Sequence, residues 1–135
     1  MELKDLQTIL PPHTPGTLAT IDQNGNPDIR GFEWQGVIDD KIVLITSNNK
    51  NVFKQIQANS NVAFFAMSDK GMVRVYGKAV QVVDEQLVQK VHANCAETVK
   101  QFYPTPKDNG FAVLQLTNGK ATVASYGVEP QTVKF

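Results

Sequence analysis

Residues 41–58, KIVLITSNNKNVFKQIQA, contain the most informative change of pattern in the chain. Residues 41–46 form a nearly continuous apolar run, which is typical of a strand covered on both faces. Asn48 or Asn49 can cap a helix that runs to about residue 58, with Val52, Phe53 and Ile56 on its inner side. We therefore expect a buried strand that leads through a short polar segment into a helix.

Short strand-like segments joined by turn residues surround this unit. Further strands are predicted over 17–21, 27–36, 62–67, 72–83, 111–116 and 121–126, and helices over 2–10 and 84–102. Turn signals lie at Asn24-Gly25, which predicts a type I′ hairpin, and at 39–40, 69–71 and 118–119. Successive hairpins of short strands favour a closed antiparallel barrel. We expect one domain over 1–135, mainly β with two or three short helices.

Composition excludes several classes of function. Thirteen basic and thirteen acidic residues cancel, which argues against a nucleic-acid partner and against a polybasic membrane anchor. The single cysteine, Cys95, rules out an intrachain disulfide. The first six residues do not resemble a signal peptide, and no apolar stretch approaches the roughly twenty residues that span a bilayer. We expect a cytoplasmic protein without a membrane partner.

The polar segment 46–51 has the features of an anion site. A helix N-terminus attracts anions through its unpaired N–H groups and its dipole. Thr46 and Ser47 offer hydroxyl donors, Asn48 and Asn51 offer amide donors, and Lys50 offers a full charge. Residues 41–68 contain three lysines and no acid, which suits a phosphate monoester. The alternative is that the asparagines only cap the helix and the lysines are solvated.

Arg30 is the second candidate for this site. If strand 27–36 pairs with strand 41–46 through the turn at 39–40, Arg30 comes near Thr46 and can bind the same phosphate through its guanidinium fork. The alternative is an exposed strand arginine. Gly31 follows directly, and a glycine within a strand often permits close approach of a ligand.

Several short motifs occur together in a characteristic order. They are LATIDxNGxP at 18–27, Arg30, TSNNK at 46–50, KQIxxN at 54–59 and VRVYGKA at 73–79. Together they resemble the pyridoxamine 5′-phosphate oxidase-like family of FMN-binding split barrels, in its general stress or nitroreductase-like branch. The resemblance covers about residues 16–126 and implies an antiparallel FMN-binding split β-barrel.

The resemblance also implies roles for individual residues. The FMN phosphate and ribityl chain would contact Arg30, Thr46, Ser47, Lys50 and Asn51, and the flavin ring would run along the backbone of Gly31, Phe32, Glu33 and Trp34. Ile45 and Asn48 complete the expected cofactor-binding set. Trp34 could instead pack at a dimer interface. True oxidases carry a phosphate-binding lysine where Val52 stands, so Lys50 or Lys54 must supply that charge.

These expectations define a function and its rivals. The resemblance implies an FMN-dependent oxidoreductase acting on an unidentified small molecule, and because flavin carries the chemistry, no catalytic side chain is expected. True pyridoxamine phosphate oxidases resemble this core but add a C-terminal segment with tryptophan and arginines that binds the vitamin substrate. Gly127–Phe135 contain no arginine, so the resemblance does not imply vitamin oxidase activity. The first alternative is a non-catalytic, stress-related module that binds FMN or, through His92, a tetrapyrrole such as haem. The second is an interaction domain that has lost its ligand. No metal site is expected.

A homodimer with FMN at its interface is also predicted. Small barrels are filled by their own side chains, and Ile42, Leu44, Val62 and Phe64 are bulky enough to fill this one. FMN must then lie outside the barrel, where a second copy related by two-fold symmetry can close the groove. Apolar residues on both faces of 42–45 also require a cover, which a second copy could provide.

Overall fold

The computed structural model describes all 135 residues. Its strands are β1 Pro15–Ile21, β2 Pro27–Glu33, β3 Val37–Ile38, β4 Lys41–Ser47, β5 Asn61–Ser68, β6 Gly71–Gln81, β7 Phe111–Ser125 and β8 Val128–Lys134. Its helices are the 3₁₀-helix η1 Leu3–Thr8 and the α-helices α1 Asn51–Ala58, α2 Glu85–Ala93 and α3 Glu97–Phe102. The predicted mainly-β class is therefore confirmed.

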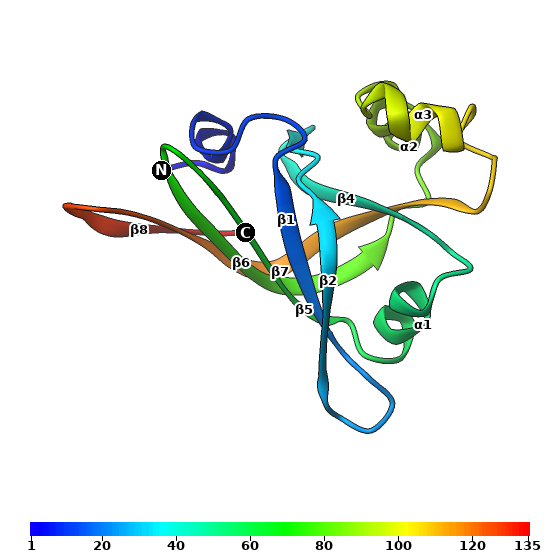
Figure 1. The fold of residues 1–135 in the computed structure, drawn as a ribbon, viewed down its shortest axis with the longest axis horizontal. Coiled ribbons are helices and arrows are strands. Elements are labelled where there is room, and N and C mark those ends of the chain that lie inside the picture. The colour runs from blue at the N-terminus through cyan, green and yellow to red at the C-terminus, as the bar shows by residue number, and fades with distance from the viewer.

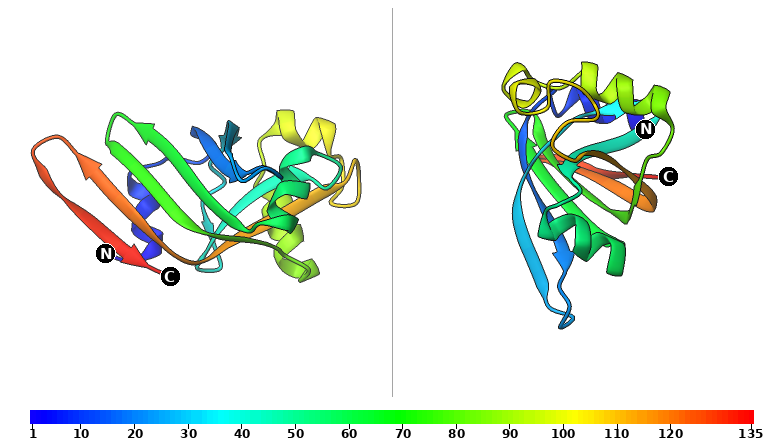
Figure 2. Two further views of the ribbon diagram at one scale, coloured as in Figure 1. Left: turned by 90° about the horizontal axis from the view of Figure 1, so that it is seen from below. Right: turned by 90° about the vertical axis from the view of Figure 1, so that its right-hand side faces the viewer.

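All eight strands belong to one antiparallel sheet with the order β2-β1-β5-β6-β7-β4-β3, and β8 pairs with β7. The first half of β7 pairs with β4, and its second half pairs with β8. In Figure 1 the β7–β8 hairpin extends to the left, away from the three α-helices, and Figure 2 shows the same arm from two further sides. The architecture is a split β-barrel, as predicted.

Apolar side chains of the chain itself fill the barrel. The four residues expected inside, Ile42, Leu44, Val62 and Phe64, all belong to the main core cluster. Trp34 is completely buried in this cluster, and its ring centroid lies 5.8 Å from that of Phe64. A filled interior leaves no room for a cofactor, so any ligand must bind on the outside of the barrel.

A second core cluster covers the other face of β4. Val43 packs there with Leu87 and Val91 of α2, and with Cys95 and Tyr103. The expectation that β4 is covered on both faces is confirmed. The cover comes from the chain's own helices, however, so the two apolar faces of β4 are no argument for a second copy.

The β1–β2 connection differs from the predicted type I′ turn. Ile21 pairs with Pro27, which leaves a five-residue loop. The Asp22 carboxylate accepts hydrogen bonds from the backbone N–H groups of Asn24 and Asn26, both at 2.9 Å, and organises this wider loop. Gly25 has a positive φ of 81° and Asn24 does not. At the β3–β4 turn, by contrast, both Asp39 and Asp40 have positive φ, as a tight hairpin requires.

The predicted turn at 118–119 is absent, because β7 continues through it. Asn118 has a φ of 50°, and the register between β6 and β7 shifts between Tyr76 and Lys78. A Cβ added to Gly119 would lie 1.8 Å from the Tyr76 carbonyl oxygen, so glycine is needed where the strands approach closely. The hairpin forms instead at Tyr126-Gly127 and leads into β8, a strand that the sequence analysis missed.

Three other boundaries also differ. The helix predicted over 84–102 divides into α2 and α3, and Lys50 is the N-cap of α1 without any side-chain cap from an asparagine. Strand 27–36 ends at Glu33, because the buried Gly36 has a φ of 103° and turns the chain. On the side of β4 that faces away from β7, only the two residues of β3 pair with it. The predicted pairing of Arg30's strand with residues 41–46 is therefore wrong.

Candidate functional site

A cavity of about 450 Å³ lies on the outside of the barrel, within the size range of small-molecule sites. The end of β2 and the chain after it supply Gly31, Phe32, Glu33 and Gln35. The end of β4 and the start of α1 supply Ile45, Thr46 and Lys50, and the opposite wall is formed by Thr98, Val99, Phe102 and Tyr103. We call it the β2–β4 cavity. It contains six of the predicted cofactor-binding residues: Gly31, Phe32, Glu33, Ile45, Thr46 and Lys50.

Two residues that line this cavity each have a buried side-chain oxygen without a hydrogen-bond partner. Thr46 is 4% exposed and Gln35 is 1% exposed, and neither Thr46 Oγ1 nor Gln35 Oε1 has a partner in the protein. Leaving a buried polar atom unpaired costs about 1–3 kcal/mol. A ligand that reaches both residues would remove this cost. The site therefore fits a ligand that carries both hydrogen-bond donors and acceptors.

Lys50 gives one end of the cavity a positive charge. It is the N-cap of α1, whose first turn contains no acidic residue. The helix start adds unpaired backbone N–H groups and the positive end of the helix dipole. Together with the Thr46 hydroxyl, this donor set suits an anion such as phosphate.

Not every predicted site residue reaches the cavity. Ser47 is buried, and its hydroxyl forms a hydrogen bond with the Tyr103 hydroxyl. Trp34 neither stacks on a ligand nor lies at a surface, because its side chain belongs to the core. Asn48 is exposed, and its backbone N–H donates to the Gly110 carbonyl at 2.8 Å. Asn51 lines a separate hollow beside the β1–β2 loop.

Arg30 does not lie beside Thr46 through strand pairing, as the sequence analysis expected. It is the cross-strand partner of Leu18 in β1, and it is not among the residues that line the cavity. Its guanidinium donates to Thr20 Oγ1 at 2.7 Å, to Gln55 Oε1 at 3.1 Å and to Asp28 at 3.0 Å. The hydrogen bond from Gln55, followed by the Arg30 charge, lowers the pKa of Asp28.

The sequence analysis missed Gln35 and the wall formed by α3. Gln35 stood within a predicted strand, where nothing distinguished it from an ordinary polar residue. The α3 residues and Tyr103, which follows the helix, reach the cavity only because the helical region folds back over β4. No local pattern could indicate that contact.

The histidines are engaged elsewhere in the structure. His13 Nδ1 lies 2.8 Å from Glu33 Oε1, and His92 Nε2 lies 2.6 Å from the Tyr103 carbonyl oxygen. No group of three or more His, Cys, Asp and Glu side chains is placed to hold a metal ion. Burial raises the pKa of the Cys95 thiol to about 11, and the side chain packs as a small apolar residue in the second core cluster.

Comparison with known proteins identifies the family. A family model described as pyridoxamine 5′-phosphate oxidase matches residues 3–123, which is most of the chain. The protein belongs to this family. The resemblance seen in the motifs is therefore confirmed. No protein in a search of curated proteins matches the chain.

Solved structures with the same fold extend this comparison. A NimC/NimA family protein from Clostridium acetobutylicum is 26% identical, with a TM-score of 0.80, over 97% of this chain and 93% of that chain. A pyridoxamine 5′-phosphate oxidase-related, FMN-binding protein from Nostoc punctiforme is 16% identical, with a TM-score of 0.66, over 90% and 86%. A haem-binding protein from Mycobacterium smegmatis is 18% identical, with a TM-score of 0.74, over 98% and 57%.

Solved structures with a similar fold therefore include one FMN-binding protein and one haem-binding protein.

None of the helices in this chain has the length and apolar character needed to cross a membrane.

Proposed function

We propose that this protein binds FMN in the β2–β4 cavity and uses it as an oxidoreductase. The observation that carries the proposal is the pair of unpartnered buried atoms, Thr46 Oγ1 and Gln35 Oε1, beside the charge of Lys50. FMN offers complementary groups, because its phosphate accepts hydrogen bonds and its ring system has an N–H donor. Membership in the pyridoxamine 5′-phosphate oxidase family supports the same cofactor.

Each residue then has a defined part. Lys50, the Thr46 hydroxyl and the first backbone N–H groups of α1 would hold the phosphate. Gly31 leaves room for the ring, because a Cβ added there would meet nothing closer than 3.9 Å. Gln35 Oε1 would accept from the ring N–H, and Arg30, already paired with Asp28, is not required. When bound, FMN supplies the hydride or electron transfer, while the chain binds it, orients it and excludes water.

The proposal includes a homodimer, since the cavity is open to solvent and good sites bury most of their ligand. Cross-strand pairing places Ile29, Ala19 and Ala63 in one row on the outer face of the sheet, and Gly31, Thr17 and Phe65 in the next. Ile29 is 65% exposed and contributes to the apolar surface of this face. Because Gly31 belongs to both this face and the cavity, a second copy seated here would also cover the ligand.

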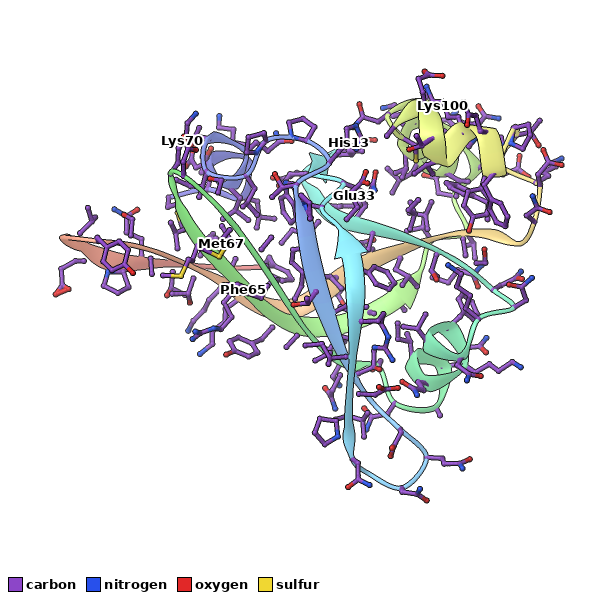
Figure 3. All side chains as sticks on the ribbon, in the orientation of Figure 1. His13, Glu33, Phe65, Met67, Lys70 and Lys100 are labelled. Atoms are coloured by element: carbon purple, nitrogen blue, oxygen red, sulfur yellow. The ribbon has the colours of Figure 1, made fainter.

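Figure 3 shows that Phe65 and Met67 lie along β5 on this part of the molecule. Met67 is 57% exposed and extends the apolar surface along the strand. A self-complementary apolar face of this kind suits the isologous contact of a two-fold dimer.

The neighbour from Mycobacterium smegmatis raises haem as the second candidate. His92 is the residue that the sequence analysis offered as its ligand. Its Nε2 lies 2.6 Å from the Tyr103 carbonyl oxygen, and the residue does not line the β2–β4 cavity. A haem ligand at this position would have to give up that contact, so the contacts favour FMN.

The test compares two lysines of one helix. Lys50→Ala removes a charge from the cavity, whereas Lys54→Ala removes the same charge one turn later, where the side chain lines the separate hollow beside the β1–β2 loop. Losing a charged partner of a phosphate costs about 1.5–3 kcal/mol, so Lys50→Ala should weaken FMN about ten- to a hundredfold in a flavin fluorescence titration. Lys54→Ala should leave the dissociation constant unchanged. Equal effects of both variants would contradict the proposed phosphate site.

A further inference from the structure

The Glu33 carboxylate lines the β2–β4 cavity with one oxygen free. Its side chain is 33% exposed, so it is reachable by a ligand. Oε1 contacts His13 Nδ1 at 2.8 Å and accepts from Gln35 Nε2 at 3.4 Å. No hydrogen bond in the structure uses Oε2. This leaves a strong acceptor unpaired on a residue that lines the cavity.

The position of His13 is fixed by the backbone at some cost. His13 has a φ of 68°, a left-handed conformation that is unfavourable for a residue with a side chain. The backbone N–H of His13 donates to the Trp34 carbonyl at 2.9 Å, and the backbone N–H of Trp34 donates to the Thr14 carbonyl at 2.8 Å. Figure 3 shows His13 and Glu33 next to each other at the end of β2. Backbone strain held by surrounding contacts is common at functional sites, and here it orients the imidazole that holds Glu33.

Charge divides the cavity into two ends. Lys50 and Glu33 are the only charged residues among those that line it. Lys50 lies at the start of α1, and Glu33 at the end of β2. The only ion pair of Glu33 is with His13, and the nearby Lys100 pairs instead with Glu97 at 3.7 Å. With the phosphate at the Lys50 end and the flavin ring N–H on Gln35 Oε1, Glu33 Oε2 would be the acceptor left over for a second molecule beside the ring.

We infer that Glu33, oriented by His13, selects substrates that carry a cationic or N–H-donating nitrogen group and disfavours carboxylates. The inference rests on the proposed function, since the substrate would lie beside the bound FMN. Oε2 would accept a charge-assisted hydrogen bond from the substrate. Glu33 is thus a specificity residue, and His13 is a positioning residue that acts through it.

The test uses two probes of similar size and opposite charge, benzamidine and benzoate. Both are titrated into the FMN-loaded protein, with binding followed by the change in flavin absorption and by calorimetry. A charge-assisted hydrogen bond is worth about tenfold or more in affinity, so benzamidine should bind at least about ten times more tightly than benzoate. Equal or tighter binding of benzoate, or no binding of either probe, would overturn the inference.

Variants separate specificity from general damage. Glu33→Gln keeps the shape and the backbone, which is the part of Glu33 expected to contact the flavin ring, and removes the charge, so it should abolish the preference for benzamidine. Glu97→Gln makes the same change on α3, where the side chain is 87% exposed and outside the cavity, and should have no effect. His13→Ala should reduce the preference without reversing it. An unchanged preference in Glu33→Gln would also overturn the inference.

Failure of the proposed function would look different. A protein that takes up no FMN gives no flavin absorption, which contradicts the proposed function by itself. Calorimetry on the cofactor-free protein then still compares the two probes. If Glu33→Gln does not fold, the ratio of the two affinities in the unmodified protein decides, and a ratio at or below one overturns the inference.

Discussion

Thr46→Val should separate ligand binding from folding. The valine has almost the same shape as threonine and suits a strand, but it lacks the hydroxyl whose oxygen is buried without a partner. If that oxygen is kept for a ligand, its removal should stabilise the cofactor-free protein and weaken FMN binding. A residue kept only for stability would show neither effect.

The magnitudes follow from the burial of Thr46, which is 4% exposed. Removing an unpaired buried polar atom gains about 1 kcal/mol, at the low end of its cost. For a chain of 135 residues this raises the melting temperature by about 3–4 °C. The lost hydrogen bond to a charged phosphate should weaken FMN by about tenfold or more.

The neighbouring hydroxyl provides the matched control. Ser47 is also buried, but its hydroxyl is paired with that of Tyr103. Ser47→Ala leaves the Tyr103 hydroxyl without this partner and should cost about 1–3 kcal/mol of stability. Thermal unfolding of both cofactor-free variants, with a flavin titration of each, checks the opposite signs. A Thr46→Val protein that is less stable and binds FMN normally would show that the Thr46 hydroxyl is not kept for a ligand.

Three other predictions concern the dimer, a turn and the buried thiol. Phe65→Glu on the outer face should convert a dimer of twice 14.9 kDa into a monomer and release the flavin, as measured by light scattering. An unmodified protein that is a monomer with FMN bound would contradict the dimer. Asp40→Gly should raise the free energy of unfolding by about 0.5–1 kcal/mol in urea, because Asp40 has a φ of 59°; a loss of stability would show that the turn is not strained. Because burial raises the Cys95 pKa from 9.0 to about 11, the folded state favours the neutral thiol, and stability should fall as pH rises from about 9 to 11. Cys95→Ala should lose that part of the pH dependence, and an unchanged profile would argue against the shift.

Local sequence patterns predicted those parts of the fold and site that depend on neighbouring residues. The end of β4 leads directly into α1, which places Thr46 and Lys50 together. The apolar residues of β4 and β5 were correctly predicted to fill the barrel. Arg30 was misplaced because a single buried glycine, Gly36, turns the chain before it can pair with β4. The Trp34 side chain lies in the core, which the sequence did not indicate, because aromatic character alone does not reveal whether a residue after a strand points into the barrel or to its surface.

The rest of the site depends on tertiary contacts. Tyr103 enters the cavity through the fold of α3 over β4, and Gln35 through the bend after β2. Neither position carries a local signal, since an ordinary polar residue and an ordinary aromatic residue are common in such segments. The strand β8 was missed because β7 bends at Asn118 without ending there.

Binding of FMN can be read from the absorption spectrum of the protein purified without added cofactor, together with analysis of the released ligand. We expect a flavin spectrum, FMN in the extract, and loss of both on Lys50→Ala with retention on Lys54→Ala. A Soret band would indicate haem instead. A spectrum without any cofactor band, unchanged after incubation with excess FMN and removal of the unbound fraction, would contradict the account.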